Sequence, residues 1–134
     1  MMFVLWLRRV AVYLLRIVLP TSLLSQLAGT VLFGRSWPGG MAESWIVCVC
    51  FLVAVAASAL STRNGQSWAH RLLKLRVCDQ DSGMPISGWR MGVRELAHLA
   101  DFMSLLVGFL WPLWDGRGQT FADKIVKAIV IEQV

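Results

Sequence analysis

The chain has 134 residues, enough for one domain, and carries a net charge of +5. Hydrophobic residues make up 57% of it and charged residues only 16%, well below the roughly 25% of an ordinary globular domain. The basic residues flank long apolar runs instead of forming an aromatic-interleaved patch, so we expect a membrane protein in contact with the lipid bilayer and no nucleic-acid partner.

The first apolar run covers residues 10–33. As a helix it would reach about 36 Å, which exceeds the roughly 30 Å hydrocarbon core and predicts a membrane span. Pro20 removes a backbone donor inside the run and predicts a kink there.

The second run, over residues 42–60, is the cleaner span. Residues 34–40 between the two runs have turn composition, so the second helix should return antiparallel to the first. Cys50, Ala54 and Ser58 recur every four residues, and small residues at this spacing let another helix approach closely. We expect a homo-oligomer or a membrane partner protein, and this face could serve that packing.

The remainder divides into three segments of one domain that covers residues 1–134. Residues 61–87 predict a short interfacial helix followed by a strand around Val77. Residues 88–114 predict a third apolar helix region, and residues 115–134 a turn and a final short strand. The fold class is therefore a mainly α membrane protein with a short two-stranded β pair.

The third apolar region can either cross the bilayer or bend and return. Positive residues favour the cytoplasmic side, which places the N-terminus there. If Arg16 within the first run is set aside, a re-entrant region leaves 11 basic residues inside against one outside, whereas a crossing leaves eight against four. Two lone strands also cannot pair across a membrane, so the re-entrant alternative is the favoured one.

The order of several loose motifs in the second half of the chain resembles the RDD family of membrane proteins. These motifs are Gly65-Gln66-Ser67-Trp68-Ala69-His70-Arg71-Leu72-Leu73-Lys74-Leu75-Arg76-Val77, Pro85-Ile86-Ser87, Val93-Arg94, Gly108-Phe109-Leu110-Trp111 and Gly118-Gln119-Thr120-Phe121-Ala122-Asp123-Lys124. The family is named for one arginine and two aspartates, and the resemblance assigns the arginine to Arg9 and the second aspartate to Asp123. The position of the first aspartate is occupied by Arg16, which reverses the charge.

The resemblance implies a multi-pass protein of a bacterial cytoplasmic membrane. The function of the family is described as unassigned, with transport suggested. The resemblance therefore implies architecture and location more firmly than activity.

Arg16 is the first candidate functional residue, because an ionisable side chain inside a span is costly. It could extend its long side chain to the cytoplasmic interface. If it lies deeper, it needs a carboxylate partner, for which Asp101 and Asp123 are the nearest candidates.

A second candidate set is Arg90, Arg94, His98 and Asp101, whose spacing places them on one helical face. They could form a proton or ion path, but the favoured interpretation is a polar face that meets water and lipid headgroups. Asp123 could ligate an ion, although we favour a helix cap or a salt bridge to Arg94 or Arg117.

The sequence contains no nucleophile in a recognisable setting, no phosphate-binding loop and no metal-ligand spacing. We therefore expect no enzyme activity, no cofactor and no metal. Two hypotheses remain: transport of a small solute or ion by an oligomer, and a non-catalytic accessory or scaffold subunit of a membrane complex. Arg16 would repel a cation, which argues against a cation route.

Overall fold

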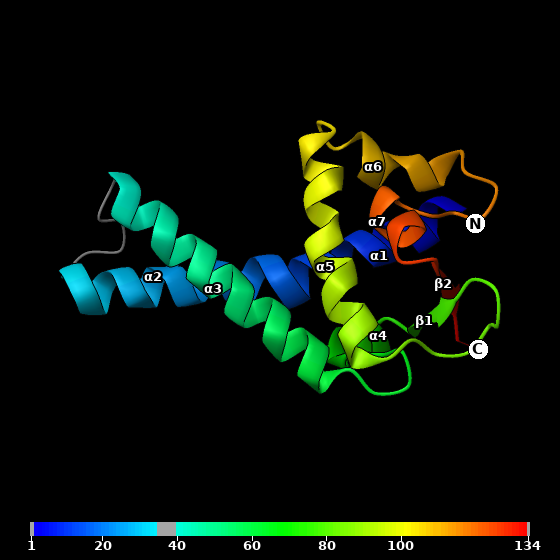
Figure 1. The fold of residues 1–134 in the computed structure, drawn as a ribbon, viewed down its shortest axis with the longest axis horizontal. Helices are drawn as coiled ribbons and strands as arrows, with labels where there is room; N and C mark the ends of the chain where they lie inside the picture. Colours follow the sequence, from blue (N-terminus) through cyan, green and yellow to red (C-terminus); the bar gives the residue numbers. More distant parts are fainter. Residues whose placement is uncertain (1, 35–39, 134) are drawn as a thin grey trace.

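The computed structural model describes residues 2–34 and 40–133 (Figure 1). The chain begins with a continuous helical run composed of α1 (Met2–Tyr13), the π-helix η1 (Leu14–Val18) and α2 (Leu19–Phe33). The run contains the predicted first apolar segment but begins eight residues earlier, at Met2 rather than residue 10. It ends at Gly34, which adopts a left-handed conformation with φ of 66°.

The π-helical turn is the way in which this helix accommodates Pro20. The Leu19 amide donates to the carbonyl of Leu14, five residues back. Because Pro20 has no N–H to donate to the carbonyl four residues earlier, the wider turn absorbs the missing bond. The proline thus changes the helical type just before it, and Arg16 lies within the widened turn.

Helix α3 (Gly40–Ser61) packs on both α2 and α5. Cys50, Ala54 and Ser58 are all buried in these contacts. The suggestion that this small-residue face serves packing between subunits is therefore wrong, because the face is buried against other helices of the same chain. The predicted turn over residues 34–40 lies mostly outside the described residues.

A short antiparallel sheet joins the middle of the chain to its end. After α4 (Trp68–Leu72), strand β1 (Leu75–Asp79) pairs with β2 (Ala128–Glu132), and Val77 lies opposite Val130. The predicted strand pair is confirmed. Since β1 precedes the third apolar region and β2 follows it, both ends of that region return to the same sheet.

The third apolar region is bent. Helix α5 (Gly88–Met103) is followed by α6 (Val107–Leu110) and the 3-10 turn η2 (Trp111–Leu113), with an angle of 110° between the two parts. Leu105 and Leu106 at the bend have positive φ values of 54° and 67°. Ser87 caps the start of α5, because its hydroxyl accepts a hydrogen bond from the amide of Arg90.

The helices α2 and α3 carry an exposed apolar surface. In Figure 1, α2 and α3 project together from the end of the molecule that holds α4, α7 (Phe121–Ile125) and the sheet. Large apolar side chains on the projecting helices are exposed, including Leu27, Val31, Trp45 and Leu52. Of the described helices, α3 alone has the length and composition of a membrane span, and α5 with α6 and η2 meets the same criterion as a bent pair.

Candidate functional site

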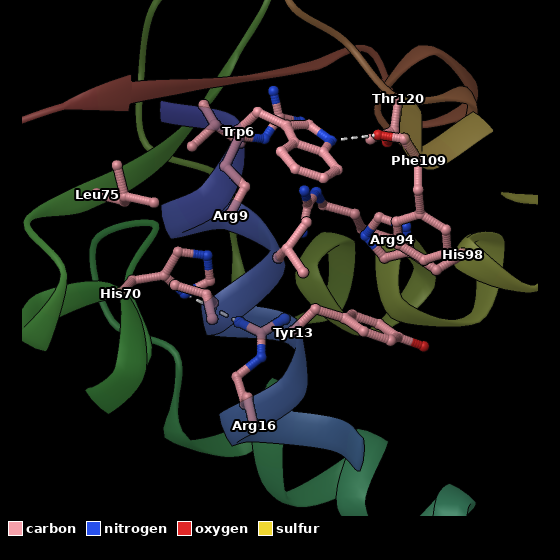
Figure 2. Close-up of a pocket in the computed structure, with 13 residues that line it drawn as sticks. Trp6, Arg9, Tyr13, Arg16, His70, Leu75, Arg94, His98, Phe109 and Thr120 are labelled. Atoms are coloured by element: carbon pink, nitrogen blue, oxygen red, sulfur yellow. Dashed lines mark hydrogen bonds between the residues drawn. The ribbon is translucent and has the colours of Figure 1, made fainter. Parts of the chain in front are cut away.

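Buried charged residues form the centre of the molecule, where the first helix, α5 and α7 meet. The first helix and α5 contribute the arginines, with Arg9 from α1, Arg16 from η1 and Arg94 from α5, and α7 contributes an aspartate. Figure 2 shows them around one small space, with His70 on one side and His98 on the other. We call these arginines with their carboxylates the arginine cluster; its carboxylates are Glu95 and Asp123.

Asp123 is the shared acceptor at one end of the arginine cluster and is fully buried. One carboxylate oxygen accepts from Arg9 and from the Thr120 amide, and the other accepts from Arg94 Nε at 2.6 Å. Burial alone would raise the pKa of Asp123, but Arg94 and Arg9 outweigh it and hold the pKa below its usual range. Asp123 therefore remains an anion that fastens α7 to two other helices.

The predicted roles of Asp123 are confirmed in part. The salt bridge to Arg94 is present. The capping residue of α7 is Thr120, and Asp123 is the third helical residue, whose side chain accepts from the Thr120 amide. Arg9, which the resemblance singled out, provides the second cation.

Arg16 forms the other end of the arginine cluster. Its side chain is 2% exposed and forms an ion pair with Glu95, which is fully buried. Arg94 Nη1 also lies 3.3 Å from Glu95, so Arg94 links the two carboxylates. Extension of Arg16 to an interface is therefore wrong, and so is the expectation that Asp101 or Asp123 is its partner.

His70 adds a neutral acceptor beside Arg16. Its Nδ1 lies 3.0 Å from Arg16 Nη1 and 2.9 Å from the Ser67 hydroxyl, and the Ser67 amide donates to the same atom. An Nδ1 that accepts these donors carries no proton. Burial, followed by the nearby Arg16 and Arg94, holds the pKa of His70 well below its usual value. A capping arrangement at the start of α4 is thereby connected to the first helix.

His98 and Asp101 form a separate buried pair on α5. The His98 Nδ1–H donates to Asp101 Oδ2 at 2.6 Å, and Asp101 Oδ1 accepts from the Phe121 amide. The rings of Tyr13 and Phe109 pack against the imidazole with centroid distances of 4.9 and 5.1 Å.

The predicted polar face of α5 therefore points into the protein. Arg94, His98 and Asp101 are 5%, 3% and 0% exposed. The interpretation that this face meets water and headgroups is wrong for these three residues. Arg90, one turn earlier, is more accessible and pairs with Asp79 at 2.6 Å.

A cavity of about 30 Å³ lies among these groups. Its walls combine cationic, imidazole and apolar side chains, contributed by Arg9, Arg16, Arg94, His70, His98, Val12, Phe109, Val130 and others. Within the described chain, no carboxylate lines it. In residues 2–34 and 40–133 there is also no group of three or more metal-ligating side chains.

Sequence reasoning missed Glu95, His70 and Ser67. Glu95 was overlooked because the four-residue spacing directs attention to Arg94 and His98. Charge balance could have indicated it, because a buried Arg16 requires a carboxylate partner. Glu95 is an acidic residue on the same predicted helix as Arg94, His98 and Asp101.

The fold and this site define a small, mainly helical protein in which paired apolar helices are joined to a polar end through buried ion pairs. The chain belongs to the RDD family, whose sequence pattern matches residues 3–127. No solved structure matches the chain significantly.

Curated relatives match part of the chain. A "Proline-rich antigen homolog" of Mycobacterium tuberculosis is 42% identical over 67 residues, which cover 50% of this chain and 28% of the relative. The "Proline-rich antigen" of Mycobacterium leprae is 33% identical over 88 residues, which cover 66% of this chain and 35% of the relative. The chain thus matches about a third of the length of these relatives.

Proposed function

We propose that this chain is an integral protein of a bacterial cytoplasmic membrane and acts as a non-catalytic accessory or scaffold subunit. In this proposal the α2–α3 hairpin crosses the bilayer, and the sheet, α4 and α7 remain together on the cytoplasmic side with the N-terminus. The exposed apolar side chains on α2 and α3 support the hairpin as the lipid-facing part. Pairing of β1 with β2 supports a third apolar region that enters and returns.

The observation that supports the scaffold function best is that the arginines of the arginine cluster are paired with carboxylates of the same chain. Arg9, Arg16 and Arg94 contact Asp123 and Glu95, and the elements that contribute them come from both ends of the chain. Breaking a buried ion pair typically costs about 3–5 kcal/mol. Such contacts resist the alternating rearrangements of a transporter and favour a rigid unit that holds other components at the membrane.

Transport of a small solute by an oligomer is the second candidate. It is favoured by ionisable residues buried near the apolar helices, a feature that often marks substrate or proton routes. The cavity of about 30 Å³ is too small to serve as a pathway, so transport requires further copies or a partner. The charge at Arg16 favours an anionic solute over a cation.

The topology is tested with single cysteines in a background that lacks Cys48, Cys50 and Cys78. We expect Met84→Cys and Arg117→Cys to react with a membrane-impermeant maleimide from the cytoplasmic side, in inverted vesicles. Met41→Cys should react from the opposite side, in intact cells. Residues 84 and 117 flank the third region, so their labelling from opposite faces would show that this region crosses the bilayer.

The function is tested on the tagged chain extracted in gentle detergent, by native mass and by flux after reconstitution. A stoichiometric foreign membrane protein and no flux in vesicles support an accessory subunit. A discrete homo-oligomer that conducts a solute, with flux lost in an Arg16→Met variant, would contradict that proposal and establish transport.

A further inference from the structure

The cavity beside the arginine cluster has a cationic wall backed by anions. Arg9, Arg16 and Arg94 line it, whereas Glu95 and Asp123, which bind these guanidinium groups, do not. Figure 2 shows Arg16 directed from the first helix toward His70 at the edge of this space. The nearest fixed charges to an occupant are therefore positive.

Arg16 also has one hydrogen-bond donor that is not used within the described residues. Among the described residues, its Nε is buried and has no hydrogen-bond partner. Its side chain is 2% exposed, so bulk water does not satisfy this donor. A buried N–H without a partner costs roughly 1–3 kcal/mol, so this donor is available to any acceptor that reaches it.

The size of the cavity restricts the occupant. A cavity needs about 10–15 Å³ to hold one water molecule. A cavity of about 30 Å³ therefore holds two waters, or one ion somewhat larger than a water molecule. Val12, Phe109 and Val130 form an apolar side of the cavity, which favours a weakly hydrated ion. Glu95 and Asp123 already balance two of the three arginine charges. A multiply charged anion would therefore leave buried negative charge without a partner.

We propose that this cavity is a binding site for one small monovalent anion of chloride size, held by the guanidinium groups of Arg9, Arg16 and Arg94. The site is independent of the choice between a scaffold and a transporter. In a scaffold the anion completes the polar junction between the first helix and the cytoplasmic end. An anion that binds the folded state alone stabilises it, by an amount that increases with its concentration.

The test measures the unfolding midpoint of the purified full chain in detergent, by tryptophan fluorescence, over a chloride series at constant ionic strength. Gluconate, which is too large for the cavity, replaces chloride. We expect the midpoint to rise by several degrees with chloride, in proportion to the logarithm of its concentration once the site is mostly filled, and bromide to act similarly. An equal unfolding midpoint in chloride and in gluconate would overturn the proposal, because it would mean that no chloride binds in the cavity.

Variants locate the effect. Val12→Leu adds a methylene to the cavity wall and should abolish the chloride dependence, while exposed Arg8→Gln should retain it. Val130→Leu, from β2, provides a second way to fill the cavity if the first variant does not fold. Chloride dependence that persists in a folded filling variant, or that disappears in Arg8→Gln, would show that the anion binds elsewhere.

Discussion

At the residue scale, the arginine cluster depends on neutral as well as charged partners. His70 accepts from Arg16 through an unprotonated Nδ1, and its pKa is held well below the usual value. Protonation of His70 would replace this acceptor by a cation facing Arg16. The junction between α4 and the first helix is therefore sensitive to acid.

We predict a specific pH dependence from His70. An unfolded histidine has a pKa of about 6.5, so below that pH the unfolded chain binds a proton that the folded chain does not. The stabilisation by neutral His70 is complete above about pH 6.5 and is lost progressively as the pH falls toward the lower folded pKa. Unfolding midpoints should therefore decline from neutral pH to mildly acidic pH.

The control for this prediction is His70→Gln, which keeps a polar acceptor but does not titrate. We expect a lower midpoint at neutral pH and a shallower decline with acid than in the parent chain. A parent midpoint that is constant across this range would show that His70 contributes nothing through its protonation.

The sequence indicated site residues only where polar residues recur at helical spacing or where a family motif marks them. Arg94, His98 and Asp101 recur on one helical face, and the salt bridge between Asp123 and Arg94 was among the predicted alternatives. Glu95 lies off that regular stripe. It is buried where the Arg16 side chain of η1 reaches it from a distant part of the chain, a tertiary contact that helical periodicity does not encode.

At the element scale, the least predictable feature is the bend between α5 and α6. The two residues with positive φ at the bend are leucines, so no glycine signal marks it in the sequence. The Ser104 hydroxyl accepts from the Gly108 amide, and Gly108 lies against Asp101. Local side-chain contacts and close packing thus hold the bend.

We predict that Gly108→Ala disrupts this bend. An added Cβ would meet the side chain and the Cα of Asp101, so α6 must move and Phe109 must shift from the His98 ring. Overpacking of this kind typically costs about 1–3 kcal/mol. Gly116→Ala is the matched control, because its Cβ would meet nothing within 4 Å. Equal unfolding midpoints for the two variants would contradict the close approach.

The strands were easier to predict than the bend. Alternation of apolar and polar residues around Val77 and the β-branched run at Ala128–Ile131 specify strands locally. Their pairing was inferred from the argument that lone strands must share one side of a membrane. The π-helical turn before Pro20 was anticipated only as a kink, because the missing donor is visible in sequence and its compensation is not.

At the scale of the whole molecule, the small-residue face of α3 joins the apolar hairpin to α5. Ala54 is 4% exposed, whereas its neighbour Val53 is 51% exposed. The sequence correctly indicated a close-packing face but suggested another subunit as its partner, because periodicity shows which residues share a face and not what covers that face.

We predict that Ala54→Leu separates α3 from its neighbours within the chain. The unfolding midpoint in detergent should fall, with a cost of about 1–3 kcal/mol for overpacking. Val53→Leu, which enlarges an exposed apolar residue, should leave the midpoint nearly unchanged. A loss of oligomeric state with an unchanged midpoint in Ala54→Leu would instead support the intersubunit role expected from sequence.

The ion pair between Arg16 and Glu95 fastens the first helix to the bent third region. A double-mutant cycle with Arg16→Met and Glu95→Met in the full chain, followed by unfolding in detergent, tests it most directly. Each single variant leaves a buried charge without its partner and should cost about 3–5 kcal/mol, whereas the double variant removes both charges and should cost clearly less than the sum.

The exposed pair of Arg8 and Glu132, in which both side chains are 42% exposed, provides the reference cycle and should show little coupling. We expect the coupling for Arg16 and Glu95 to exceed that reference by at least about 2 kcal/mol. Additive losses in the Arg16–Glu95 cycle would contradict the account, because they would mean that these two residues do not hold the molecule together through each other.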